Sequence, residues 1–287
     1  MRAPMLSRLF LLTGMAATLL SPIPAAAATS PHLIGLERQL SALVSGRPGE
    51  YGIAALDLRD GSSVAVNGNV SFAMASTVKL AIAAAYLADV DRGRRSLSDT
   101  VAGRTAAKAM ELMIVRSDNQ AADQLLAALG GPAVVQQWLR SHDMAGIRVD
   151  RTIAQLLRDR GHLADVKDVA TPNAMVALLG RLVDATVLTP KSSTFLFDLM
   201  RRCATGTHRI RALLPTGTTV EDKTGTLDGV TNDVGFVTMP DGHRVAVAIF
   251  ARGGRDRQSG IASIARRLYD YFADSERNAL AMFMQLR

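Results

Sequence analysis

Residues 77–202 form a long stretch that is rich in Ala and Leu and poor in runs of β-branched residues. This composition, with apolar residues at helical spacing, predicts a region that is almost wholly helical. Strand-forming segments lie on both sides of it, at 51–58 and 63–66 before it and at 233–239 and 244–251 after it. The chain therefore has to bring two distant strand regions together around a helical insertion.

Each strand region predicts a hairpin, because a turn with Asp-Gly lies within 59–61 and again within 240–242. Helices are expected at 31–44 and at about 260–272, outside the strands. The pattern predicts an α+β fold in which both termini build one antiparallel sheet, flanked by helices and carrying an all-helical lobe.

The predicted domain boundaries follow from this pattern. We expect an α/β lobe from 29–75 and 203–287, a helical lobe from 76–202, and an active site in the cleft between the two.

Residues 1–28 have the features of a secretory signal peptide. Arg2 and Arg8 precede an apolar run at 9–20, and Pro22, Pro24 and a small-residue stretch follow it. The apolar run is shorter than the roughly 20 residues that a membrane span needs. We expect cleavage near Ala27 or Ala28, a secreted or periplasmic protein, and no stable membrane insertion after cleavage.

Charge and cysteine content exclude several function classes. The net charge of +7 falls to +5 without Arg2 and Arg8, and no block of Lys and Arg is present. This favours solubility and does not predict nucleic-acid binding. Cys203 is the only cysteine, so no internal disulfide can form, and we expect it to be a small buried residue. The five histidines are scattered without ligand spacing, so neither a metal site nor a cofactor is predicted.

Three short motifs carry the chemistry: S-x-x-K at 76–79, S-D-N at 117–119 and K-T-G at 223–225. Each is weak alone, but their joint occurrence by chance is on the order of one in a thousand or below. Ser76 and Lys79 are three residues apart where a helix starts, so the hydroxyl can reach the amine. Burial and the charge of Lys223 would lower the pKa of Lys79 and allow it to act as a base.

On these motifs the chain resembles the class A β-lactamases, a branch of the penicillin-recognising serine hydrolases. The likeness extends over ASTVKL, SDNQAADQLLAALGG, DVATPNAM and EDKTGTLDGVTNDVGFV. It implies an acyl-enzyme on Ser76, with Lys79 and Ser117 as further catalytic residues and Ser117 returning a proton to the leaving nitrogen. Asp118 is expected to accept loop N–H groups.

The resemblance also implies a substrate-binding set. Asn119 would orient Lys79 and the substrate amide, and Lys223 and Thr224 would hold a substrate carboxylate, with Gly225 permitting close backbone approach. The N–H groups of Ser76 and Thr226 would form the oxyanion hole. Arg209 matches an arginine that supports carboxylate binding in some class A members; the alternative is a surface salt bridge. The complete predicted set is Asn119, Lys223, Thr224, Gly225, Thr226 and Arg209.

The sequence departs from the family where class A enzymes carry the Ω-loop glutamate that activates the deacylating water. In the matching stretch, Ile153 holds the glutamate position and Leu157 the asparagine position. A shift of the alignment by two residues would bring Gln155 there, which is no base either. Arg151 and Asp168 still match the pair that closes the loop. In a rearranged loop, Asp150, Asp159 or Asp165 could replace the glutamate; the alternative for each is an exposed loop carboxylate.

Three functions stay open at this point. The first is β-lactam hydrolysis with slow deacylation, and thus antibiotic resistance. The second is a cell-wall D,D-peptidase or esterase of the same fold, and the third is a non-turnover β-lactam binding protein. The substrate is a small β-lactam or a cell-wall peptide in each case, and the family's usual state is a monomer.

Overall fold

The computed structural model describes residues 29–159 and 167–285. The predicted signal peptide, at 1–28, lies outside the described residues. Two polypeptide regions that are distant in the sequence meet in one five-stranded antiparallel sheet of order β2-β1-β9-β8-β7. The α+β fold with a sheet built from both ends of the chain is therefore confirmed.

The predicted strand at 63–66 agrees with the structure, and the ends of the other three predicted strands differ from the observed ones by at most three residues. The sheet consists of β1 (Glu50–Asp57), β2 (Ser63–Val66), β7 (Val220–Leu227), β8 (Val230–Thr238) and β9 (Arg244–Arg252). Short pairs outside the sheet are β3 (Phe72–Ala73) with β6 (Val169–Ala170), and β4 (Thr100–Val101) with β5 (Arg104–Thr105).

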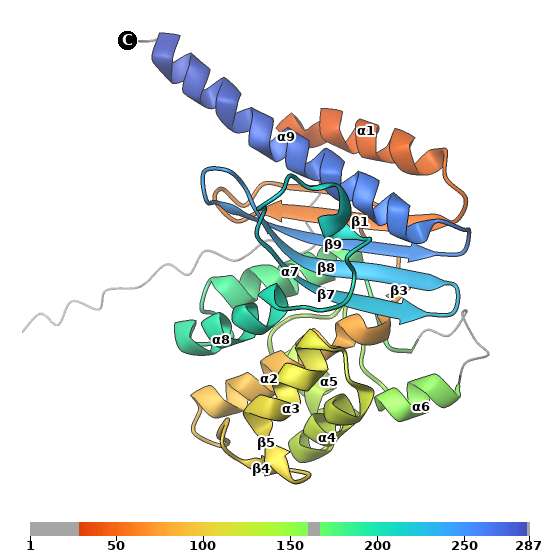
Figure 1. Cartoon of the computed structure of the whole chain (residues 1–287), viewed down its shortest axis with the longest axis vertical. Coiled ribbons are helices and arrows are strands. Elements are labelled where there is room, and N and C mark those ends of the chain that lie inside the picture. The colour runs from red at the N-terminus through yellow and green to blue at the C-terminus, as the bar shows by residue number, and fades with distance from the viewer. Residues whose placement is uncertain (1–28, 160–166, 286–287) are drawn as a thin grey trace, which may run out of the picture.

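Helices cover both faces of the sheet (Figure 1). One face is covered by α1 (Ile34–Ser45), which follows the 3-10 turn η1 (Pro31–Leu33), and by α9 (Arg257–Gln285). The final helix thus begins before and ends after the predicted range. The opposite face contacts α7 (Pro172–Val183), which packs on β1 and β9.

The remaining helices form the other half of the molecule. They are α2 (Lys79–Asp91), α3 (Ala106–Val115), α4 (Asn119–Leu129), α5 (Pro132–Ser141), α6 (Ile153–Arg158) and α8 (Pro190–Arg201), with the 3-10 turn η2 (Ala75–Val78). The 3-10 turn η3 (Ile210–Leu213) instead packs on α9. The prediction that 77–202 is almost wholly helical is confirmed for these helices and is wrong for β4, β5, β6 and the non-helical connections at 92–99 and 142–152. The range 76–202 also includes α7, although α7 packs on the sheet; the lobe boundaries stay a prediction.

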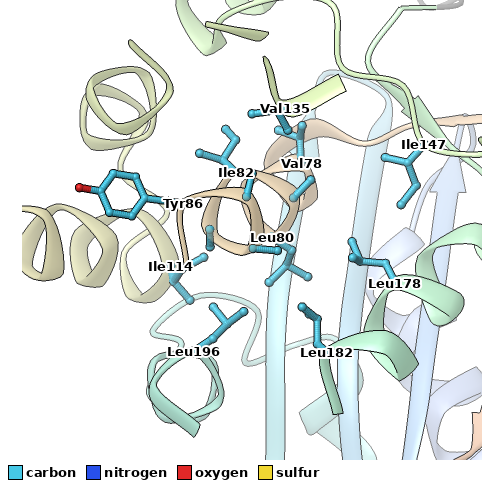
Figure 2. Close-up of a cluster of buried hydrophobic side chains, with 14 of the residues drawn as sticks. Val78, Leu80, Ile82, Tyr86, Ile114, Val135, Ile147, Leu178, Leu182 and Leu196 are labelled. Atoms are coloured by element: carbon cyan, nitrogen blue, oxygen red, sulfur yellow. The ribbon is translucent and has the colours of Figure 1, made fainter. Parts of the chain in front are cut away.

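The helix α2 is the centre of the larger core (Figure 2). Its residues from Lys79 to Ala88 are all buried, and helices from every side pack on it. Buried apolar side chains stabilise a fold by roughly 1.5–3 kcal/mol each. A helix that is enclosed in this way gives the residue at its N-terminus a rigid position. No helix of the described ranges is long and apolar enough to cross a bilayer.

Candidate active site

Ser76 lies in the 3-10 turn η2, directly before α2. Ala75, the residue before it, has φ +50°, a left-handed conformation that is uncommon for a residue with a side chain. The amide of Asn232 on β8 holds this segment by donating to the carbonyl oxygens of Ala73 at 2.8 Å and Met74 at 3.0 Å. Sequence reasoning did not select Asn232, although it lies within the quoted segment EDKTGTLDGVTNDVGFV.

Gly225 permits the close approach of β7 to the same turn. A Cβ atom added to Gly225 would lie 2.6 Å from the carbonyl oxygen of Met74 and 3.1 Å from Thr77 Cγ2. Neither partner is the free end of a flexible side chain, because one is backbone and the other is on a buried threonine. The close backbone approach that the sequence predicts at Gly225 is thus made by the turn that carries Ser76.

Lys79 places its amine among the other motif residues. Its Nζ lies 3.1 Å from Ser76 Oγ and 3.2 Å from Ser117 Oγ, and it donates to the Ser117 carbonyl oxygen at 2.6 Å and to Asn119 Oδ1 at 2.7 Å. The side chain is fully buried. Burial, followed by the positive charge of Lys223, lowers the pKa of Lys79 to about 7. A substantial neutral fraction at pH 7 can accept a proton from the Ser76 hydroxyl.

Ser117 bridges the two lysines from the connection between α3 and α4. It has φ +55°, and its Oγ lies 2.9 Å from Lys223 Nζ in addition to its contact with Lys79. Asp118 caps α4 by accepting the Ala121 N–H at 2.6 Å, so it is a structural acceptor as expected, but for an N–H group of a helix and not of a loop. The hydroxyl of Ser117 can therefore exchange protons with either amine.

Lys223 lies on β7, the edge strand that faces this cluster. It is fully buried and also donates to the carbonyl oxygen of Thr224 at 2.9 Å. Burial lowers the pKa of Lys223 to about 8, so it stays mostly charged at neutral pH. A charged lysine at the edge of a sheet is suited to attract an anionic group of a ligand.

Arg209 holds the end of β7 at Gly225 and Thr226 through hydrogen bonds. Its guanidinium donates to the carbonyl oxygens of Gly225 at 3.1 Å and Asn232 at 2.8 Å, and to Thr226 Oγ1 at 2.6 Å. Arg209 is buried, and the alternative of a surface salt bridge is wrong. Thr224 Oγ1 lies 2.5 Å from the hydroxyl of Thr205, a contact that no sequence motif indicated.

Cys203 lies behind Thr205, with its Sγ 3.3 Å from Thr205 Oγ1. The residue is half-buried, and burial raises the pKa of its thiol. A raised pKa leaves little reactive thiolate at neutral pH. No group of three or more His, Cys, Asp or Glu side chains suited to a metal lies within the described ranges.

The connection in which the family carries its glutamate is closed by the predicted pair of Arg151 and Asp168. Arg151 Nε donates to Asp168 Oδ2 at 2.6 Å, which confirms this pair. Asp168 Oδ1 also accepts the N–H groups of Asp150 and Arg151. Two of the three carboxylates considered as substitutes are engaged with arginines, because Asp150 pairs with Arg148 and Asp159 with Arg151. The third, Asp165, lies outside the described residues.

Ile153 begins α6 and is buried, so an apolar side chain occupies the position that the alignment assigns to the glutamate. Gln155 does not replace it. Thr152 and Gln155 form a capping box, in which the Gln155 amide oxygen accepts the Thr152 N–H at 2.9 Å. The Gln155 side chain therefore serves the start of α6.

Asp123 is a site residue that sequence reasoning missed. Its two carboxylate oxygens accept the N–H groups of Ile153 at 2.6 Å and Ala154 at 2.9 Å. It follows Asn119 by one turn of α4, and this spacing of four residues is the signal that could have identified it. A cavity of about 490 Å³ lies beside these contacts and is lined by Asn119, Gln120, Asp123, Gln124, Ala127, Ala154 and Leu157.

Comparison with known proteins decides the family. The model of the β-lactamase enzyme family matches residues 35–272. The chain belongs to this family. A β-lactamase of Streptomyces albus G is 31% identical over 81% of this chain and 82% of its own length. The extended-spectrum β-lactamase PER-1 of Pseudomonas aeruginosa is 27% identical over 82% of this chain and 87% of its own length.

The solved structures that resemble this chain are also β-lactamases. A reconstructed ancestral class A β-lactamase has a TM-score of 0.78 at 33% identity and covers 82% of this chain and 99% of that chain. The family member described here is thus a β-lactamase-like serine hydrolase of class A.

Proposed function

We propose that this β-lactamase family member hydrolyses β-lactams through an acyl-enzyme on Ser76, and that it releases the acyl group slowly. One observation carries the proposal: the Ser76 hydroxyl, the Lys79 amine, the Ser117 hydroxyl and the Lys223 amine form one chain of contacts of 2.9–3.2 Å.

In the acylation step, Ser76 Oγ attacks the carbonyl carbon of the lactam and its proton passes to neutral Lys79. The N–H groups of Ser76 and Thr226 stabilise the oxyanion. Collapse of the tetrahedral intermediate breaks the ring C–N bond, and Ser117 gives its proton to the nitrogen. Lys79 then returns a proton to Ser117, so the charges balance.

The remaining site residues bind the substrate in this proposal. Lys223 and Thr224 hold its carboxylate, and Arg209 adds positive charge behind Thr226. Asn119 orients Lys79 and the side-chain amide of the substrate, and Gly225 keeps β7 close to Ser76.

Deacylation needs a base that activates water, and such a base typically contributes about 10²- to 10⁴-fold to its own step. Ile153 has no group that could take this role. The same observation favours two alternatives, a cell-wall peptidase or esterase and a non-turnover β-lactam binding protein, because neither needs the Ω-loop glutamate. We further propose that residues 1–28 are removed as a signal peptide and that the mature protein is secreted or periplasmic. We expect it to be a monomer.

The test is incubation of the mature protein with a chromogenic cephalosporin while both absorbance and protein mass are followed. We expect an adduct on Ser76 that forms quickly and decays slowly, and no adduct in Ser76→Ala. A stable adduct without turnover would favour the binding protein. The absence of any adduct would contradict the Ser76 mechanism. In a parallel assay with a cell-wall peptide as substrate, release of D-alanine would favour the peptidase.

A further inference from the structure

A second cavity, of about 660 Å³, lies between β8, η3 and the start of α9. Its lining comes from the segment before η3, from β8 and from the start of α9, and includes His208, Thr231, Arg255, Asp256 and Arg257. The mechanism above uses none of these residues. The cavity thus needs an account of its own.

The cavity adjoins the end of β7 where the substrate carboxylate is proposed to bind. Thr231 on β8 pairs directly with Thr226 on β7, so their side chains are on one face of the sheet. Arg209 donates to Thr226 Oγ1 at 2.6 Å, and Arg257 donates to Thr231 Oγ1 at 3.1 Å. Two guanidinium groups are therefore held side by side on a pair of threonines, one behind the proposed carboxylate site and one in the wall of the cavity.

The charge of the lining is positive. Arg255 and Arg257 are opposed by one acidic side chain, Asp256, and His208 adds an imidazole ring. Arg257 is fixed, because it also donates to the carbonyl oxygens of Gly253 and Gly254. Arg255 differs from it: within the described part of the chain, its side chain makes no hydrogen bond or ion pair. An exposed cation in a hollow with a fixed second cation is suited to bind an anion.

We propose that this cavity is a subsite for a second anionic group of the substrate, beyond the carboxylate that binds at Lys223 and Thr224. This proposal rests on the proposed function, because that function places the first carboxylate. In a cephalosporin the ring atom that carries the carboxylate is bonded to the atom that carries the C3 substituent. A C3 substituent that ends in a carboxylate would extend along the threonine pair towards Arg255.

The test uses two cephalosporins that differ only in whether the C3 substituent ends in a carboxylate or in the matching carboxamide. The rate of Ser76 acylation per unit concentration is measured for both by mass spectrometry. We expect the wild type to favour the carboxylate by about fivefold, the upper end for a partly exposed ion pair. Arg255→Gln should reduce this ratio to near one, and 0.5 M salt should reduce it in the wild type.

Arg38→Gln is the matched control, because it removes the same charge from an exposed arginine on α1, on the far side of the sheet from β7 and Ser76. It should leave the ratio unchanged. Equal ratios in the wild type, Arg255→Gln and Arg38→Gln would overturn the subsite while leaving the Ser76 mechanism intact.

A second arm separates the subsite from the proposed function. Equilibrium binding of the same two compounds is measured with Ser76→Ala, with and without Arg255→Gln. We expect tighter binding of the carboxylate compound, by about fivefold, only when Arg255 is present. If wild type forms no adduct but this selectivity persists, the function fails and the subsite stands; if the selectivity is absent, the subsite is overturned whatever the acylation result.

Discussion

The two sides of the candidate active site differ in the contacts that their ionisable side chains make. On the side of α2 and β7, Lys79 and Lys223 are buried, and no carboxylate of the described residues is hydrogen-bonded to either amine. Both pKa values are lowered towards neutrality. On the side of α6, every carboxylate within the described ranges that the structure places near Ile153 is engaged with backbone N–H groups or with arginines. The first side is arranged for proton transfer, and the second is arranged to hold a helix in place.

This difference predicts that the formation and the release of the acyl-enzyme can be changed separately. Acylation depends on groups whose protons can move at neutral pH. On the α6 side, the carboxylates of the described residues serve structural contacts. The four predictions below test whether the two sides differ in this way.

The largest effect is expected from removal of the amine on the first side. Lys79→Met should slow acylation of Ser76 by about 10²- to 10⁴-fold, because the hydroxyl loses its proton acceptor. Stopped-flow measurement with a chromogenic cephalosporin gives the rate. Lys108→Met is the control, since Lys108 is an exposed lysine paired with Glu111. An acylation rate within threefold of wild type in Lys79→Met would contradict the assignment of the base.

The second prediction introduces a carboxylate on the other side. Ile153→Glu combined with Leu157→Asn should shorten the lifetime of the adduct by up to about 10²-fold, because it restores a general base beside the ester. The decay of the adduct is followed by mass spectrometry. Ile153→Gln with Leu157→Asn has nearly the same shape without the base and should leave the lifetime long. Equal lifetimes in the two double variants would mean that α6 does not face the ester as aligned.

The third prediction concerns pH. Lys79 must be neutral to accept a proton, and its pKa of about 7 means that the active fraction grows as pH rises. Lys223 must be charged to bind the carboxylate, and its pKa of about 8 means that this fraction falls at higher pH. The acylation rate should therefore rise about sixfold from pH 6 to 7.5 and decline above pH 8. A rate that falls steadily from pH 6 would require a charged Lys79 and would exclude it as the base.

The smallest effect on the chemistry is expected from Asp123. Asp123→Ala removes the acceptor of two N–H groups at the start of α6 and should lower the free energy of unfolding by about 1–2 kcal/mol. Thermal unfolding measures this loss. Asp274→Ala is the control, because Asp274 is an exposed carboxylate on α9. Acylation of Ser76 should change by less than threefold, and a large loss would show that Asp123 acts on Lys79 instead.

Much of the fold could be predicted because it depends on local patterns. The two hairpins follow from alternating strands around Asp-Gly turns, and the helical middle follows from its composition. The end of the last helix could not be predicted: α9 continues past Phe272, and the apolar period that marks a helix does not define where it stops. The short strand pairs were missed for a similar reason, because two residues are too few to show a period.

Some residues of the candidate site could be predicted from local motifs, and others could not. The three motifs identified Ser76, Lys79, Ser117 and Lys223, since each motif carries its own chemistry within a few residues. Asp123, Thr205 and Asn232 were missed because each acts through a partner far away in the chain, on α6, β7 and the Ser76 turn respectively.

The sequence by itself determined which functional groups exist and the absence of a carboxylate at Ile153. Only the tertiary structure decided how these groups behave. Burial of α2 and β7 removes water from both lysine amines, which favours their neutral forms and brings their pKa values near 7 and 8. A pKa depends on the surroundings of a group in three dimensions, and no local sequence pattern specifies those surroundings.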